Sequence, residues 1–78
     1  MIGPYDVTLW GRSSKHLYFI TKDGKKRALK DNLSKKELAM ELGIGSEDAK
    51  VFREETWFLA YDMPIVNEEF VLEKFWKS

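Results

Sequence analysis

Few side chains in this sequence are of the types that carry acid–base or metal chemistry. His16 is the single histidine, and the chain has no cysteine. A zinc site would need carboxylates beside one imidazole, which is an unusual set for a closed structural site. A Ser-His-Asp arrangement would also depend on this one histidine, and no serine lies in a nucleophile elbow. We therefore expect no metal and no cofactor.

The carboxylates offer no better candidates for catalysis. Glu54-Glu55 and Glu68-Glu69 are adjacent in the sequence. Neighbours on a helix point about 100° apart, so neither pair is placed to share a proton. Gly43-Ile44-Gly45 is too short for a phosphate-binding loop and no GK[ST] follows it. We expect no catalytic residue, and the sequence predicts a protein that is not an enzyme.

A group of basic residues could instead contact phosphates. It surrounds the Asp23-Gly24 dipeptide and comprises Lys22, Lys25, Lys26, Arg27, Lys30, Lys35 and Lys36. A basic hairpin can lie against a nucleic-acid backbone without reading its sequence. The alternative is that these side chains form a solvated edge and are neutralised by the rest of the fold.

The charge is divided between the two halves of the chain. Residues 1–40 hold nine Lys and Arg against four Asp and Glu, whereas residues 41–78 hold four against nine. Such asymmetry is typical of a surface that faces a polyanion. It is also compatible with neutralisation inside one fold, and with head-to-tail self-association of two copies.

Aromatic residues make up 14% of the chain. Four of them in the acidic half are of types favoured as anchors of protein interfaces, namely Trp57, Tyr61, Phe75 and Trp76. The alternative is that these rings form the core, because a short chain needs large apolar side chains to bury enough area. Exposure of two or more of them in the monomer would favour an interface.

The first part of the chain predicts a three-stranded antiparallel meander over residues 5–30. Residues 5–10 alternate with period two, so that Tyr5, Val7 and Leu9 share a face, and residues 11–14 form a turn. Residues 16–21 are apolar on both faces, which indicates a central strand covered on both sides. Asp23-Gly24 predicts a hairpin that leads into a charged edge strand at 25–30.

The second part predicts helices. Ser34 and Glu37 form a capping box for a helix that Gly43 ends, and Ser46 caps a second helix. Together they make a helical hairpin over residues 34–55. Residues 56–61 either continue the second helix or form a fourth strand. A C-terminal helix is expected over residues 67–77.

The segment 34–55 resembles a helix-turn-helix. It has a small residue in the first helix, a glycine at the turn, and apolar residues between the helices, namely Ala39, Gly43, Ile44 and Phe52. The second helix, however, starts with Glu47 and Asp48, which phosphates would repel at the entrance to the major groove. We therefore favour a helical hairpin that packs on the sheet over a recognition helix.

These expectations combine into a small single α+β domain, residues 1–78, with the meander packed against two or three short helices on one face. The N-terminus shows no signal peptide, and no apolar run is long enough to span a membrane, so we expect a soluble cytoplasmic protein. The favoured function is a non-enzymatic protein-interaction module, such as an inhibitor or adaptor encoded by a phage or other mobile element. The alternative is a regulatory protein that contacts nucleic acid through the basic hairpin.

Overall fold

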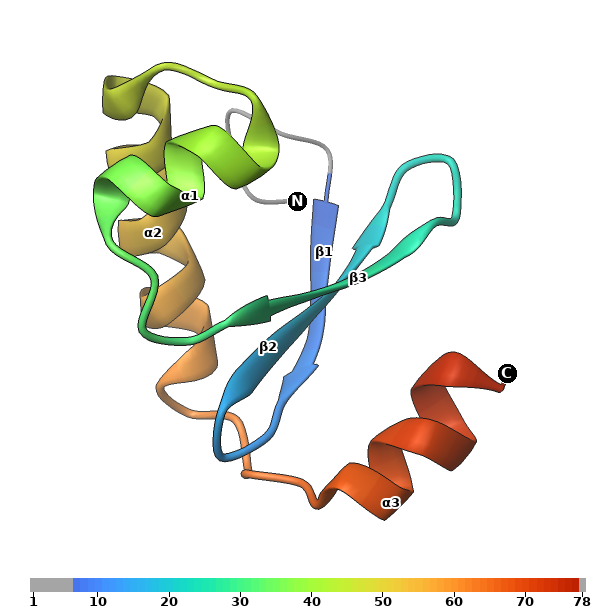
Figure 1. The fold of residues 1–78 in the computed structure, drawn as a ribbon. Coiled ribbons are helices and arrows are strands. Elements are labelled where there is room, and N and C mark those ends of the chain that lie inside the picture. Colours follow the sequence, from blue (N-terminus) through green and yellow to red (C-terminus); the bar gives the residue numbers. More distant parts are fainter. Residues whose placement is uncertain (1–6, 78) are drawn as a thin grey trace.

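A three-stranded antiparallel sheet lies at the centre of the computed structural model, which describes residues 7–77 (Figure 1). The strands are β1 (Val7–Arg12), β2 (His16–Thr21) and β3 (Lys26–Lys30), in the order β1-β2-β3. The sequence prediction of an α+β domain with an N-terminal meander is confirmed. Tyr5, which was predicted to share a face with Val7, lies outside the described residues.

The first strand extends two residues further along the chain than the sequence indicated, because a β-bulge lets the pairing continue to Arg12. Leu9 pairs with Phe19 and Gly11 pairs with Tyr18, so Trp10 is the extra residue of β1. The strand continues to Arg12, and the prediction of a turn at residues 11–14 is wrong by two residues. A bulge accommodates one unpaired residue and lets the ladder resume beyond it.

The hairpin between β2 and β3 forms where Asp23-Gly24 predicts it. Gly24 has a φ of +87°, a conformation that glycine adopts without a steric penalty. The Gly24 N–H donates to the Thr21 carbonyl at 2.9 Å, and the Thr21 N–H donates to the Lys25 carbonyl at 2.8 Å. The loop is therefore longer than a two-residue turn.

Helix α1 (Lys35–Leu42) has the ends that the sequence predicts. The Glu37 N–H donates to Ser34 Oγ at 3.2 Å and the Ser34 N–H donates to the Glu37 carboxylate at 3.4 Å, so the capping box is present. Gly43 ends the helix at a φ of +67°, and the Gly43 N–H donates to the Ala39 carbonyl.

Helix α2 (Ser46–Ala60) begins one residue earlier than expected, and its end follows one of the two alternatives, since the residues after Glu55 continue the helix. The Ala49 N–H donates to the Gly45 carbonyl at 3.0 Å, so Gly45 is the N-cap and Ser46 is already helical. Residues 56–60 continue the helix, so within the described chain the sheet has three strands and residues 56–61 add no fourth. The reason is that Ala49, Phe52, Thr56 and Ala60 are buried at helical spacing.

The C-terminal helix consists of α3 (Glu68–Val71) and a π-helical segment, η1 (Leu72–Trp76). Its N-cap is Asn67, whose side-chain oxygen accepts a hydrogen bond of 2.7 Å from the Phe70 N–H. The Lys77 N–H donates to the Leu72 carbonyl, which is the five-residue spacing of a π-helix.

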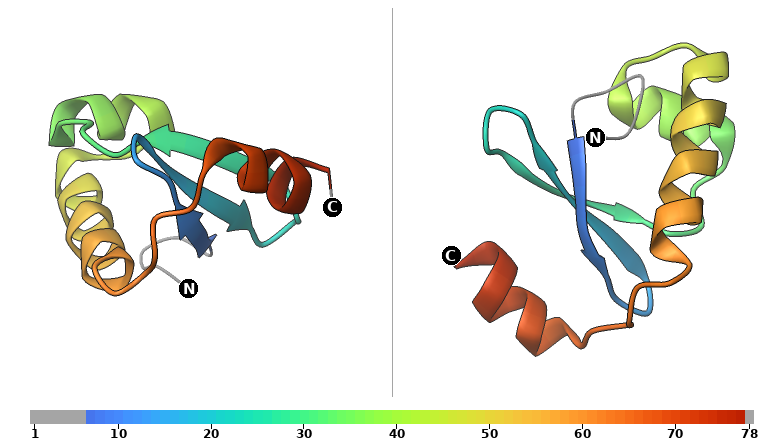
Figure 2. Two further views of the ribbon diagram at one scale, coloured as in Figure 1. Left: turned by 90° about the horizontal axis from the view of Figure 1, so that it is seen from below. Right: turned by 180° about the vertical axis from the view of Figure 1, so that it is seen from behind.

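The helices cover both faces of the sheet, not one as expected (Figure 2). α1 and α2 pack on the face that carries Leu9, Leu17, Phe19 and Leu29. The C-terminal helix packs on the other face, where Val71 and Phe75 meet Tyr18. The expectation failed because β2 is apolar on both sides, and its second side needs a cover of its own. The prediction that this central strand is covered on both sides is correct.

The chain crosses from one layer to the other at the end of β1. Arg12 Nε donates to the Met63 carbonyl at 3.0 Å, and the Val66 N–H donates to the Arg12 carbonyl at 2.9 Å. An isolated parallel bridge joins Arg12 to Ile65. These backbone contacts fix the segment 63–66 along the edge of the sheet and so set where the C-terminal helix begins.

Candidate interaction surfaces

The side chains that could have carried catalysis do not gather into a site in the described part of the chain. His16 is half-buried on β2, and its Nδ1 is enclosed without a hydrogen-bond partner. Glu68 accepts a hydrogen bond of 3.0 Å from the Tyr18 hydroxyl, whereas Glu54 and Glu55 are exposed on α2. No group of three or more histidine or acidic side chains among residues 7–77 has the spacing of a metal site.

The Tyr18 hydroxyl belongs to a buried hydrogen-bond network. It lies 3.0 Å from Ser13 Oγ and 3.0 Å from the Glu68 carboxylate. Because its one hydrogen goes to Glu68, Ser13 must be the donor in the other bond. Burial raises the pKa of Tyr18 above its ordinary 10.0, and Glu68 adds to the rise while Ser13 opposes it. This network attaches the C-terminal helix to the sheet.

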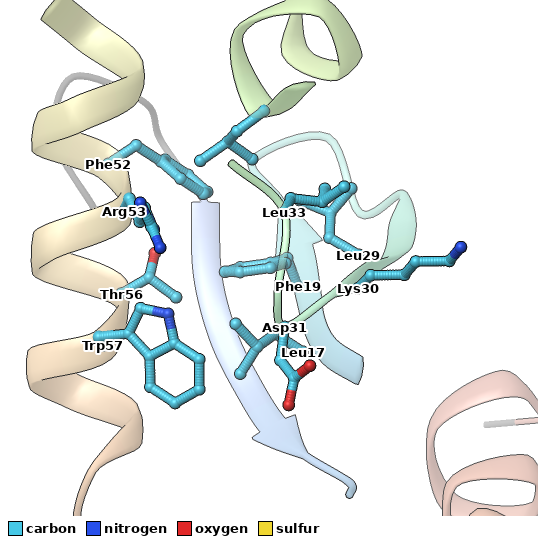
Figure 3. Close-up of a pocket in the computed structure, with 11 residues that line it drawn as sticks. Leu17, Phe19, Leu29, Lys30, Asp31, Leu33, Phe52, Arg53, Thr56 and Trp57 are labelled. Carbon is cyan, nitrogen blue, oxygen red and sulfur yellow. The ribbon is translucent and has the colours of Figure 1, made fainter. Parts of the chain in front are cut away.

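A narrow pocket lies between α2 and the sheet (Figure 3). Phe52, Thr56 and Trp57 line it from the helix, and Phe19 and Leu17 face them from β2. Its volume is about 20 Å³, which is room for one water molecule. Thr56 Oγ1 is buried beside it without a hydrogen-bond partner. The pocket is a gap in the core and is too small for an organic ligand.

The tip of the basic hairpin lies apart from α1 and α2, at the end of the sheet away from the turn between β1 and β2 (Figure 1). Lys22 and Lys25 are exposed there. The Thr21 hydroxyl donates to the Asp23 carboxylate, and this bond lowers the pKa of Asp23 below its ordinary value. The tip therefore keeps one carboxylate between its two lysines.

The other basic residues of the predicted group are directed elsewhere. Lys26 lies with its Nζ 5.8 Å from the centre of the Phe75 ring, on the side of the C-terminal helix. Arg27 lies on the opposite face, where it pairs with the Glu41 carboxylate at 3.8 Å. Side chains of consecutive strand residues point to opposite faces of a sheet, so these two cations cannot contact one phosphate strand together.

Lys30, Lys35 and Lys36 lie at the far end of β3 from the hairpin tip. Lys30 ends the strand, and Lys35 begins α1. Lys35 lines a hollow with Lys50, Arg53, Glu54 and Trp57. The structure thus divides the seven predicted residues among a projecting tip, two faces of the sheet and the start of α1.

The four aromatic residues predicted as interface anchors are also divided. Tyr61 is 79% exposed and Trp76 is 45% exposed, whereas Phe75 is 1% exposed and packs against Trp10 and Tyr18. Trp57 is half-buried against the core. Two of the four rings are therefore exposed in the monomer, which is the condition that favours an interface.

The sequence reasoning missed the most exposed ring. Phe58 is 80% exposed on α2, and Val51 and Leu59 are exposed on the same helix. The signal was present in the spacing of Thr56 and Ala60, since a helix that buries these two must turn Phe58 to the opposite side. The sequence alone did not decide whether residues 56–61 are helix or strand, so the direction of the Phe58 side chain could not be predicted.

We define the outer face of α2 by its exposed apolar side chains, Val51, Phe58 and Leu59, and by the carboxylates beside them. Glu54 and Glu55 line a shallow hollow together with Phe58 and Leu59. An apolar surface bordered by carboxylates can hold a side chain that is both apolar and cationic.

None of the helices within residues 7–77 combines the length and the hydrophobicity that a membrane span needs. Comparison of the chain with protein-family models, with curated proteins and with solved structures found no match.

Proposed function

We propose that this domain is a non-enzymatic protein-interaction module, of the inhibitor or adaptor kind, that contacts its partner through the outer face of α2. The observation that carries the proposal is the exposure of two rings at the end of α2, Phe58 at 80% within the helix and Tyr61 at 79% at its C-cap. Large exposed rings on a small domain are typical of surfaces that another molecule covers.

These rings are not needed by the core. The face of the sheet below α2 is already filled by Leu9, Leu17, Phe19, Leu29 and Phe52, together with side chains of α1. The Phe19 and Phe52 rings pack there at a tilt of 45°, with their centres 5.4 Å apart. The apolar surface of Phe58 and Tyr61 therefore stays in contact with water and adds no buried area to the fold. A role in binding explains why the surface carries these two rings.

The proposal assigns no catalysis, because the sequence contains one histidine and no cysteine. It also leaves out Phe75, whose ring is available to a partner only if the C-terminal helix leaves the sheet. Trp76, at 45% exposure, lies on that helix and belongs to a second, smaller surface.

The test is affinity purification of the tagged protein from cells of its source, followed by mass spectrometry. We expect the double variant Phe58→Ala/Tyr61→Ala to lose a partner that the wild type retains. The matched control is Met40→Ala, which removes an exposed apolar side chain from α1. Equal recovery of partners by the wild type and by the double variant would refute the proposal.

A second candidate function is contact with nucleic acid through the hairpin tip, which its position apart from α1 and α2 favours (Figure 1). The structure sharpens the test, because Lys22 and Lys25 are exposed at the tip whereas Lys26 and Arg27 are directed to opposite faces of the sheet. Anisotropy of labelled oligonucleotides should show binding that weakens with salt and that Lys22→Gln/Lys25→Gln abolishes. Lys35→Gln/Lys36→Gln is the control. No binding at low salt would remove this candidate.

A further inference from the structure

The outer face of α2 has an apolar centre. Val51 and Phe58 are seven residues apart, two turns of the helix, and both point away from the side that buries Phe52 and Thr56. Leu59 widens this centre on one side. Nothing within residues 7–77 covers Phe58, so this apolar face is open to solvent in the monomer.

The charges around this centre are mostly negative. Between residues 46 and 62 the sequence has five acidic residues, Glu47, Asp48, Glu54, Glu55 and Asp62, against Lys50 and Arg53. All five acidic side chains are exposed. Lys50 and Arg53 line the neighbouring hollow with Lys35, and only Glu54 belongs to both hollows. The hollow on the outer face is therefore lined by carboxylates, and the two cations of α2 line the neighbouring hollow instead.

We propose that the outer face of α2 binds a basic amphipathic segment of a partner protein. The inference rests on the proposed function and names the chemistry of the partner. Charge complementarity selects the occupant: the apolar centre requires apolar side chains, and the carboxylates require cations beside them.

The geometry of the hollow matches a lysine or an arginine. The aliphatic part of such a side chain packs on Phe58 and Leu59, and its cationic end reaches the carboxylates of Glu54 and Glu55. A guanidinium or ammonium group over the Phe58 ring gains a further attraction from the π-electrons. Leucine-type side chains of the same segment cover Val51, two helical turns from Phe58.

Other occupants fit less well. Nucleic acid is repelled by the five carboxylates, and two copies of this face repel each other for the same reason. The basic hairpin of a second copy brings the right charge. However, within the described hairpin, residues 16–30, there is no large exposed hydrophobic side chain to meet Phe58.

The experiment measures binding of a fluorescent helical peptide built from leucine and lysine in amphipathic order. We expect binding that weakens as salt is added, and a loss of about tenfold or more in affinity for Glu54→Lys/Glu55→Lys. Phe58→Ala should weaken binding without removing its salt dependence. Glu73→Lys, an exposed change on the C-terminal helix, is the control and should bind as the wild type does. Circular dichroism checks that each variant is folded.

A charge swap makes the test specific. A matched peptide of leucine and glutamate should not bind the wild type, and should bind Glu54→Lys/Glu55→Lys. Equal binding of both peptides by the wild type, or an equal loss from Glu73→Lys, would overturn the inference. So would size-exclusion chromatography showing self-association that Glu54→Lys/Glu55→Lys abolishes, because a second copy would then occupy the face. If instead the purified partner is lost in Phe58→Ala/Tyr61→Ala while no basic peptide binds, the proposed function stands and this inference fails.

Discussion

The two faces of the sheet are covered in different ways. On one face, aliphatic residues and phenylalanines from β1, β2, β3, α1 and α2 form one core. On the other face, a single short helix covers Tyr18 with Val71 and Phe75, and the Trp10 and Phe75 rings pack at a tilt with their centres 4.9 Å apart. The Tyr18 hydroxyl accepts a hydrogen bond from Ser13 and donates one to Glu68, which completes this second contact.

The comparison indicates two levels of stability within one small domain. Apolar area from five elements gives a cooperative unit, because no element can leave without exposing its neighbours. A layer formed by one helix can open by itself when its few contacts break. We therefore expect the C-terminal helix to detach before the α1–α2 face unfolds.

The largest effect is expected at Phe52, whose ring packs against that of Phe19 in the first core. Phe52→Ala leaves a cavity between α2 and the sheet and should lower the free energy of unfolding by about 3–5 kcal/mol. For a domain of this size, such a loss removes most of the stability. Urea unfolding followed by tryptophan fluorescence measures it. A loss no larger than that of a surface substitution would contradict the two-level picture.

Phe75→Ala should cost about 3 kcal/mol, at the lower end of the range for such substitutions, because the C-terminal helix can move away and limit the cavity. Hydrogen exchange should show faster exchange in residues 68–76 and unchanged protection in α2. If protection falls equally in both regions, the two faces unfold together and the domain does not have two levels of stability.

Tyr18→Phe removes the hydroxyl that joins Ser13 to Glu68 and should cost about 1–2 kcal/mol. The raised pKa of Tyr18 predicts how this contribution varies with pH. The folded state holds the phenolic proton more tightly than the unfolded state, so the stabilisation is complete below pH 10 and is lost as the pH rises through the folded-state pKa. Denaturant midpoints between pH 8 and pH 11 should fall more steeply for the wild type than for Tyr18→Phe. Parallel curves would show that this network does not hold the C-terminal helix.

The smallest effect has the opposite sign. Thr56 Oγ1 is buried without a hydrogen-bond partner, so Thr56→Val removes a desolvated hydroxyl while keeping the branched shape. We expect the free energy of unfolding to rise by up to about 1 kcal/mol. Thermal unfolding measures it, with Thr21→Val as a control because that hydroxyl is hydrogen-bonded. A loss of stability in Thr56→Val would mean that the hydroxyl has a partner in solution, such as a bound water.

Local signals in the sequence predicted most of the elements. The capping box at Ser34, the glycine at position 43 and the Asp23-Gly24 turn each act within a few residues, and each lies where expected. The apolar character of both sides of β2 also predicted a central strand correctly. The bulge at Trp10 and the N-cap at Gly45 depend on the register between elements, which a single segment does not reveal.

The surfaces were harder to predict than the elements. The basic residues cluster in the sequence, but strand alternation sends Lys26 and Arg27 to opposite faces. Phe75 and Tyr61 are both aromatic residues of the acidic half, yet one is buried and the other exposed, because tertiary packing decides which side of a helix meets the sheet. The importance of Phe58 follows only once residues 56–60 are known to be helical.

The attachment of residues 63–66 at Arg12 also bears on the order of folding. Up to the end of α2, most contacts join elements that follow one another in the chain, such as β1 with β2, β2 with β3 and α1 with α2. The bond from Arg12 to Met63, in contrast, spans 51 residues. Contacts between residues far apart in the chain form late, because closing a long loop costs entropy before any contact compensates for it. We therefore expect the second layer to assemble onto a sheet that already carries the first, at a rate that depends on the crossing segment.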